Sequence, residues 1–120
     1  MRFWMGVMIM VVLGMGFSTQ ALASPGVCGK LDSISRGQTT AKEIQNCHRK
    51  TQGAWYDFMA LMICRDLNKL SIKGARAKDI TACLEDISKK RFKYARLKQC
   101  KKRKRKNSDV VRRCIRRSRA

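Results

Sequence analysis

Six cysteines are the residues of this 120-residue chain whose chemistry their spacing constrains most. They are Cys28, Cys47, Cys64, Cys83, Cys100 and Cys114, and no two are closer than 14 positions. Zinc sites usually take ligand pairs about two to four residues apart. The single histidine, His48, is a poor complement to such a site. An even number of cysteines behind an export signal instead predicts three disulfide bonds.

The amino-terminal segment has the features of such an export signal. Arg2 precedes an uncharged, mostly apolar run from Phe3 to Phe17, and the segment ends in Ala21-Leu22-Ala23, a pattern that signal peptidases cut. A membrane anchor is the alternative, but a spanning helix needs roughly 20 apolar residues and this run is shorter. We therefore expect residues 1–23 to be a cleaved signal peptide and the mature protein to be secreted or periplasmic.

Lysines and arginines supply a second kind of chemistry, the binding of anions. Residues 24–97 hold 15 of them against seven acidic residues, whereas residues 98–120 hold 12 against one. This asymmetry indicates a polyanion or an anionic surface as partner, with solubility as the alternative explanation. The predicted polyanion-binding residues are Lys98, Lys101, Lys102, Arg103, Lys104, Arg105, Lys106, Arg112, Arg113, Arg116, Arg117 and Arg119.

Residues suited to catalysis are sparse. The histidine is flanked by Arg49 and Lys50, and the acidic residues are scattered along the chain. The sequence contains no glycine-rich phosphate loop, HExxH motif or nucleophile elbow. We therefore expect no enzymatic activity, no cofactor, no bound metal and no small-molecule substrate.

The cysteines also mark an internal repeat. The segments CGKLDSISRGQTTAKEIQNC, from Cys28, and CRDLNKLSIKGARAKDITAC, from Cys64, have the same length and share Leu, Ser, Ala, Lys and Ile at matching positions. They begin 36 residues apart, and Cys100 follows after another 36. The third copy, CKKRKRKNSDVVRRC, is shorter and its first half consists of cations. A period of this size indicates a repeated supersecondary unit.

Helical periodicity identifies the repeated unit as α-helical. Apolar residues recur at helical spacing, for example at Ile80, Cys83 and Ile87. Because the mature part has no proline after Pro25, long helices are allowed. We predict helices over about 27–36, 40–71, 76–106 and 108–118, where Gly53 could kink the second. The two long helices would form a central hairpin around Gly74.

Two helix starts have capping signals. Thr40 and Glu43 form a candidate capping box, in which the side chain of each residue accepts a hydrogen bond from the backbone N–H of the other. Asn107 or Ser108 can cap the last helix, and Asp109 would favour its first turn.

Five aromatic residues are expected near the middle of the assembly. They are Trp55, Tyr56, Phe58, Phe92 and Tyr94. Aromatic residues at helical spacing usually pack in the core. Stacking on bases or insertion at a lipid interface is the alternative.

Turn positions select among the possible disulfide pairings. Gly37 and Gly74 lie near the midpoints of the first two copies, and Asn107 lies midway between the last two cysteines. Chain reversal at these points would bring the cysteines of each copy together on antiparallel helices. The predicted bonds are Cys28–Cys47, Cys64–Cys83 and Cys100–Cys114. The rival Cys47–Cys64 could use a turn at Gly53, whereas Cys83–Cys100 has no turn signal between its members.

Together these patterns predict an all-α fold of small disulfide-stapled helical hairpins, built from a repeat of about 36 residues and ending in a strongly basic segment. Residues 24–97 would form the stapled helical domain, and residues 98–120 would form a basic C-terminal hairpin of the same domain.

Electrostatics then suggests the function. We expect an exported small basic protein that binds nucleic acid, an anionic glycan or an envelope component without sequence readout. One alternative is a membrane-active or antimicrobial protein, because cationic helices with an apolar strip bind anionic lipids. Another is a secreted effector in which KKRKRK acts as a nuclear-localisation cluster. An acidic protein is a further possible partner.

Overall fold

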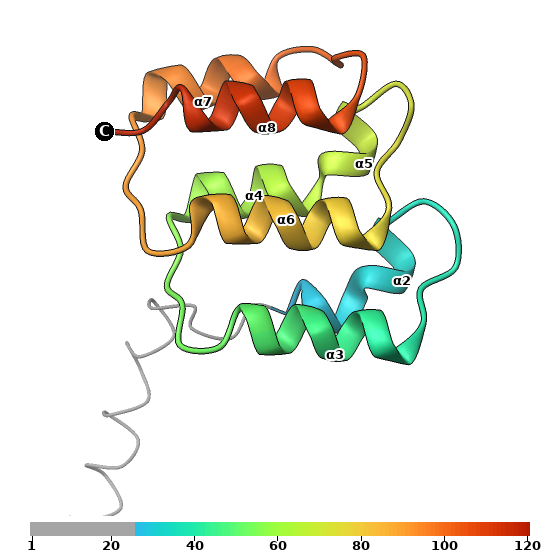
Figure 1. Ribbon diagram of the computed structural model, residues 1–120. Coiled ribbons are helices and arrows are strands. Elements are labelled where there is room, and N and C mark those ends of the chain that lie inside the picture. Colours follow the sequence, from blue (N-terminus) through green and yellow to red (C-terminus); the bar gives the residue numbers. More distant parts are fainter. Residues whose placement is uncertain (1–25) are drawn as a thin grey trace, which may run out of the picture.

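The computed structural model of the protein describes residues 26–120 (Figure 1). The predicted signal peptide, residues 1–23, lies outside the described residues. The described part is all-helical, as predicted. Its elements are the 3-10 helix η2 (Cys28–Lys30) and the α-helices α2 (Leu31–Ile34), α3 (Ala41–Lys50), α4 (Phe58–Arg65), α5 (Leu67–Leu70), α6 (Ala77–Ile87), α7 (Tyr94–Lys101) and α8 (Ser108–Arg116).

The helices form three hairpins that are stacked one on another (Figure 1). Hairpin 1 joins η2 and α2 to α3, hairpin 2 joins α4 and α5 to α6, and hairpin 3 joins α7 to α8. Hairpin 2 is the middle layer, because α6 contacts α3 on one side and α8 on the other. The tips of the hairpins lie at one end of the stack, and the connections between hairpins lie at the opposite end (Figure 1).

Each hairpin contains one disulfide bond between its two halves. The bonds are Cys28–Cys47, Cys64–Cys83 and Cys100–Cys114, with Cα–Cα distances of 5.6, 5.6 and 5.8 Å. These are the pairs that the turn positions predicted. Within residues 26–120 no cysteine is free, and three disulfides are compatible with an extracellular or periplasmic protein.

The predicted long helix over residues 40–71 is wrong. α3 ends at Lys50, and α4 begins only at Phe58. Between them the chain reverses through Gly53, whose φ of 76° lies in the left-handed region that favours glycine. A glycine that was expected to kink one helix therefore separates two hairpins.

The predicted long helix over residues 76–106 is wrong as well. α6 ends at Ile87, and the chain reverses at Lys89, which has a φ of 57° although it is not a glycine. The backbone N–H of Lys89 donates to the carbonyl of Trp55 at 2.9 Å. A contact between the two connections thus accompanies a turn that has no local sequence signal. The central hairpin around Gly74 is consequently one of three similar layers.

Side-chain caps fix the starts of three helices. The capping box of α3 is confirmed: Thr40 Oγ1 accepts from the N–H of Glu43 at 3.1 Å, and Glu43 Oε1 accepts from the N–H of Thr40 at 2.9 Å. Asn107 caps α8, as one of the two predicted candidates, by accepting from the third residue of the helix at 3.1 Å. Asp57 caps α4 in the same way. These bonds satisfy N–H groups that have no partner inside the helix.

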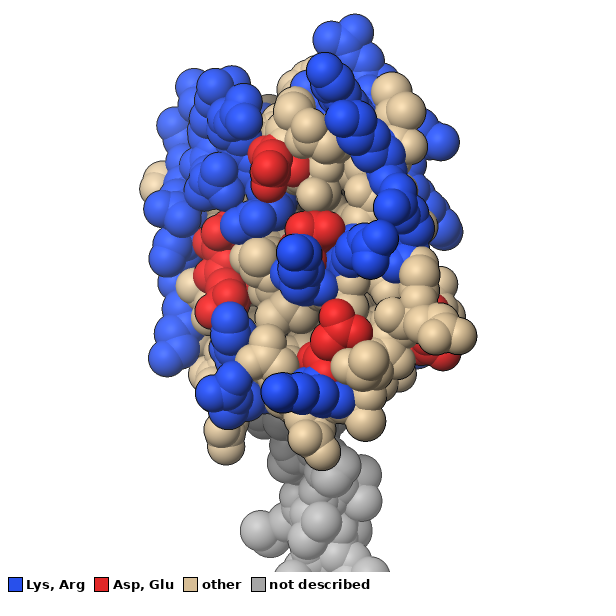
Figure 2. All heavy atoms as spheres, turned by 45° about the vertical axis from the view of Figure 1, so that its right-hand side comes forward, with Lys and Arg blue, Asp and Glu red and all other residues tan. Residues whose placement is uncertain are grey.

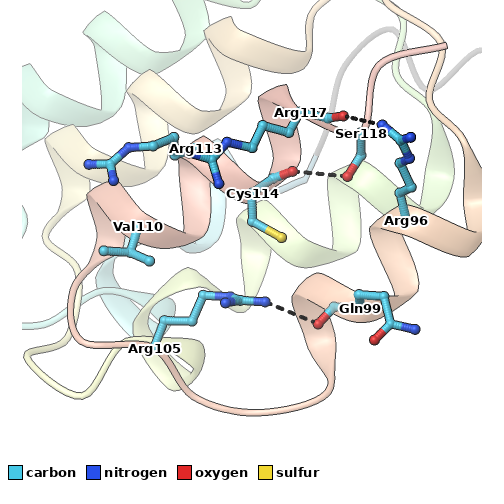
Figure 3. Close-up of a pocket in the computed structure, with 8 residues that line it drawn as sticks. All are labelled: Arg96, Gln99, Arg105, Val110, Arg113, Cys114, Arg117 and Ser118. Carbon is cyan, nitrogen blue, oxygen red and sulfur yellow. Dashed lines mark hydrogen bonds between the residues drawn. The ribbon is translucent and has the colours of Figure 1, made fainter.

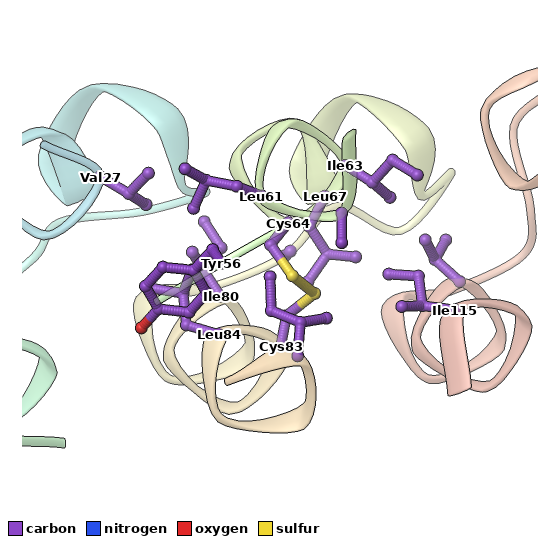
Figure 4. Packing of buried hydrophobic residues seen from close by; sticks show 14 of the residues in the cluster. Val27, Tyr56, Leu61, Ile63, Cys64, Leu67, Ile80, Cys83, Leu84 and Ile115 are labelled. Atoms are coloured by element: carbon purple, nitrogen blue, oxygen red, sulfur yellow. A yellow bond between two sulfur atoms is a disulfide. The ribbon is translucent and has the colours of Figure 1, made fainter. Parts of the chain in front are cut away.

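The core runs through all three layers and is centred on α6. The stripe of α6 formed by Ile80, Cys83, Leu84 and Ile87 is fully buried, at the spacing of a helix face. Figure 4 shows the Cys64–Cys83 bond at the centre of this packing, with Val27 of hairpin 1 on one side and Ile115 of α8 on the other. The buried disulfides are therefore part of the core and not surface clips.

The aromatic residues divide between the core and the surface. Tyr56 and Phe92 are buried, and burial raises the pKa of the Tyr56 phenol to about 12. Trp55, Phe58 and Tyr94 are exposed to 39%, 65% and 60%. The expectation that all five pack in the core is thus wrong for three of them.

The tips of hairpins 1 and 2 touch closely beside Gly74. The N–H of Arg36 donates to the carbonyl of Ala75, and Arg36 Nη1 donates to the carbonyl of Lys73 at 2.8 Å. Gly74 has a φ of 80°, and a Cβ added there would lie 2.7 Å from Asn68 Oδ1 and 2.9 Å from Arg36 Cδ. The backbone favours glycine at this position, and a larger residue would have to displace the side chains of Asn68 in the same hairpin and Arg36 in the neighbouring one.

The substitution Gly74→Ala should therefore destabilise the protein more than Gly37→Ala or Gly53→Ala. All three glycines have positive φ, so each alanine bears a left-handed strain of roughly 1–2 kcal/mol. Only at Gly74 would the new methyl group also collide with other atoms, since nothing lies within 4 Å at the other two. Chemical unfolding of the three variants measures the difference, and equal losses of stability would contradict the close contact between the tips.

Candidate anion-binding surface

Net charge rises sharply from the first two layers to the third. Residues 26–56 contain five cations and two acids, and residues 57–87 contain five of each. Residues 88–120 contain 17 cations and one acid, a net charge of +16. Figure 2 shows lysines and arginines covering both margins of one face, with the acidic residues between them. The anion-attracting part of the molecule is therefore hairpin 3 together with the connection that leads into it.

The six consecutive cations from Lys101 to Lys106 include the loop at the tip of hairpin 3. α7 ends at Lys101, so the predicted continuation of a helix to residue 106 is wrong. On a helix, like charges four residues apart would face each other and repel. The loop is nevertheless held by its backbone: the N–H of Arg105 donates to the carbonyl of Leu70, and the N–H of Ile72 donates to the carbonyl of Arg105, both at 2.8 Å.

The side chains of this loop differ in their exposure. Arg105 is half-buried, whereas the other five cations, Lys101, Lys102, Arg103, Lys104 and Lys106, are exposed. The Cys100–Cys114 bond closes the hairpin immediately before the loop. The exposed cations are therefore attached to a backbone fixed by a disulfide on one side and by hairpin 2 on the other.

α8 and the residues directly after it carry two rows of arginines that face different surroundings. Arg112 and Arg116 lie one turn apart and face the Asp86 carboxylate of α6, to which Arg112 Nε donates at 2.8 Å and Arg116 Nη1 at 3.1 Å. The hydrogen bond to Asp86 raises the pKa of Arg112 above its ordinary value. Arg119 Nη2 donates to the backbone carbonyl of Asp86 at 3.4 Å. This row joins hairpin 3 to hairpin 2, and its charge is partly offset within the protein.

The second row, Arg113 and Arg117, lines a cavity of about 300 Å³ between α7 and α8 (Figure 3). Arg96 from α7 and Arg105 from the tip loop also line it. Two of the guanidinium groups are held by backbone carbonyls: Arg105 Nη2 donates to Gln99 at 3.2 Å, and Arg96 Nη1 donates to Arg117 at 3.3 Å. Val110 and Cys114 contribute an apolar part of the wall.

The cavity differs in its electrostatics from the group formed by Asp86, Arg112 and Arg116, the Asp86 cluster. Within residues 26–120, none of its four arginines forms a salt bridge with a carboxylate. Arg105 Nε is buried and has no hydrogen-bond partner in the described chain. A buried charged donor without a partner is unfavourable. The arrangement favours an anion in the cavity.

The predicted polyanion-binding residues thus fall into separate environments. Some form the exposed loop, Arg105, Arg113 and Arg117 line the cavity, and Arg112, Arg116 and Arg119 donate to Asp86. Lys98 lies on α7 with its Nζ 6.0 Å from the centre of the Tyr94 ring. The prediction omitted Arg96, which lies four residues before Cys100 and hence on the face of α7 that carries the disulfide. That spacing is the signal that could have identified it.

Comparisons with known proteins yield no family for this chain: it matches no family model, no curated protein and no solved structure. Among the helices of residues 26–120, none combines the length and apolar character needed to cross a membrane. The same residues contain no group of three or more histidine, cysteine or acidic side chains that could hold a metal ion. On their charge and lining residues, the exposed loop and the arginine-lined cavity form the candidate site.

The substitution Asp86→Asn should loosen the contact between hairpins 2 and 3. It removes the nearer charged partner of Arg112, whose side chain is only 20% exposed, and leaves only the Asp109 carboxylate at 3.7 Å. We expect a loss of about 1.5–3 kcal/mol in the free energy of unfolding, as for other hydrogen bonds to charged groups.

Asp109→Asn is the matched control for this prediction. Its carboxylate is 72% exposed and lies 3.7 Å from Arg112. Its removal should cost less than about 1 kcal/mol. Chemical unfolding of both variants would refute the assigned role of Asp86 if the two losses were the same.

Proposed function

We propose that this protein is exported and binds polyanions through hairpin 3. The observation that carries the proposal is the net charge of +16 on residues 88–120, next to a middle layer with equal numbers of cations and acids. Charge added for solubility alone has no need to be concentrated in one layer. A binding surface does, because the field of clustered charges adds up over one face and attracts anions to it.

The attachment of the basic loop supports the same function. A disordered basic tail must become ordered when it binds, and this lowers its affinity. In hairpin 3 the loop backbone is bonded to hairpin 2 through Arg105, and the Cys100–Cys114 bond closes the loop. The cations are therefore arranged before a partner arrives, which reduces the entropy lost on binding.

The source of affinity would be the release of counterions from the polyanion. Each phosphate neutralised by a lysine or arginine releases bound cations, so binding weakens steeply as salt rises. Lysine side chains on an exposed loop make such contacts with little preference for sequence. We accordingly propose a binding protein and not an enzyme, with nucleic acid or an anionic glycan as the partner.

We also propose that the three hairpins are copies of one unit of about 36 residues. The cysteine separations of 19, 19 and 14 support this view, since only the last is shortened. In the third copy the cations from Lys101 to Lys106 occupy the first half of the segment between the cysteines. The unit would thus have been adapted for anion binding by replacing the part that forms the tip.

Replacing four exposed lysines of the loop by glutamine should weaken binding to duplex DNA and reduce its salt dependence. The variant is Lys101→Gln, Lys102→Gln, Lys104→Gln and Lys106→Gln. If all four contact phosphates, the slope of log affinity against log salt should fall by about 3.6, because each contact contributes roughly 0.9. Fluorescence anisotropy over a salt series measures both quantities.

The matched control removes the same charge from hairpins 1 and 2. It is Lys30→Gln, Lys42→Gln, Lys69→Gln and Lys78→Gln, all exposed lysines outside the salt bridges of the described chain. Its slope should change by less than half as much. An affinity for duplex DNA that does not depend on salt, or equal changes of the salt slope in the two variants, would contradict the proposal. Leakage of anionic vesicles without any affinity for DNA would favour the membrane-active alternative.

A further inference from the structure

Arginines and lysines occupy different places in hairpin 3. The basic residues that line the cavity are all arginines: Arg96, Arg105, Arg113 and Arg117. The exposed cations of the loop are four lysines and Arg103. Lysine acts as a hydrated point charge, whereas the planar guanidinium group offers paired donors that match the oxygens of a phosphate. The cavity is therefore suited to hydrogen-bonding one anionic group in a fixed orientation, whereas the loop is suited to general electrostatic attraction.

We propose that the cavity binds one phosphate monoester group. This inference rests on the proposed function and names a chemical group that hairpin 3 would hold at a defined place. Arg105, which lines the cavity, has a buried Nε without a partner in the described chain, so a phosphate group in the cavity would offset a charge that the protein leaves uncompensated. Arg113 on α8 and Arg117 directly after its end lie one helical turn apart, and both side chains line the cavity.

Charge and size favour a monoester over other oxyanions. A phosphate monoester carries about −1.5 to −2 at neutral pH, whereas a phosphodiester or a sulfate ester carries a single negative charge. Four guanidinium groups without a carboxylate partner interact most strongly with the dianion. A volume of about 300 Å³ is at the small end for ligand cavities, which suits one phosphate group and the first carbons attached to it. Val110 and Cys114 provide an apolar wall for those carbons.

A phosphate monoester as the ligand predicts a specific pH dependence of the binding affinity. Arginine remains charged throughout the range in which proteins are stable. The other residues that line the cavity are Gln99, Val110, Cys114 and Ser118, and none of them ionises between pH 5 and 8, since Cys114 is in a disulfide. The second ionisation of a phosphate monoester has a pKa near 6. Affinity should therefore rise about tenfold between pH 5 and pH 7.5 as the dianion forms, while a sulfate ester should bind weakly and without this change.

Titration calorimetry of the oxidised protein tests the proposal with three small probes. Phenyl phosphate should bind at one site per chain, more tightly at pH 7.5 than at pH 5. Phenyl sulfate, of similar size and lower charge, should bind at least about tenfold more weakly. Inorganic phosphate separates the free anion from the ester: tighter binding of inorganic phosphate than of phenyl phosphate would overturn the assignment of an ester site.

Two double variants separate the cavity from the general charge of hairpin 3. Arg113→Lys with Arg117→Lys keeps the charge and removes the paired donors, and it should weaken phenyl phosphate binding by about tenfold. Arg91→Gln with Lys93→Gln removes two exposed charges of the same part of the chain outside the cavity and should change phenyl phosphate binding by less than about threefold. Circular dichroism confirms that both variants are folded.

The outcomes distinguish this inference from the function on which it rests. Equal weakening of phenyl phosphate binding by the two double variants, or binding without a defined stoichiometry, would overturn the assignment of a phosphate site to the cavity. If DNA binding kept its salt dependence in that case, the proposed function would stand alone. If the unaltered protein bound neither DNA nor phenyl phosphate, both the proposed function and the phosphate site would be overturned.

Discussion

The disulfide bond between the two halves of each hairpin is the constraint on which the rest of this structure depends. The helices are short, and α3, α6 and α8 contain only 10, 11 and 9 residues. Helices of this length are marginal in isolation because the first turn is costly to form. A bond that closes a loop of about 15–20 residues contributes roughly 3 kcal/mol in the chain-entropy account. Since every cysteine except the half-buried Cys114 is fully buried, the same sulfur atoms also fill the core.

Stacking of the stapled units explains how a segment with 17 cations and one acid can hold a defined shape. The middle hairpin supplies the carboxylate and the backbone hydrogen-bond partners that hold the third hairpin in place. Its Asp86 carboxylate binds the Arg112 and Arg116 guanidinium groups. Leu70 at the end of α5 accepts a backbone hydrogen bond from Arg105, and Ile72 donates one to it. The arginines of α8 are thereby divided into one row that holds the protein together and another row that faces a cavity. Proximity in the sequence conceals this division, because neighbouring residues such as Arg112 and Arg113 face different ways.

The sequence predicted the features that depend on local chemistry. The helical class, the capping box at Thr40 and the disulfide pairing followed from periodicity, side-chain donors and the positions of Gly37, Gly74 and Asn107. The two long helices were wrong because the chain reverses at Gly53, where only a kink was expected, and because it turns at Lys89 with no glycine or proline to mark the turn. That turn lies against Trp55, a contact that no local pattern reveals. The Asp86 cluster and the arginine-lined cavity depend on which helices become neighbours, so the sequence could identify the basic residues but could not sort them.

Amide hydrogen exchange tests most directly whether the third disulfide holds the basic loop in place. In the oxidised protein, the N–H groups of Ile72 and Arg105 should be protected, since both donate across the contact between hairpins 2 and 3. When Cys100 and Cys114 are both replaced by serine, we expect exchange at Arg105 and in α7 and α8 to accelerate by on the order of 100-fold, the factor for a loss of about 3 kcal/mol. Protection in α4 and α6, which the Cys64–Cys83 bond joins, should persist. Unchanged exchange at Arg105 in the serine variant would contradict the account.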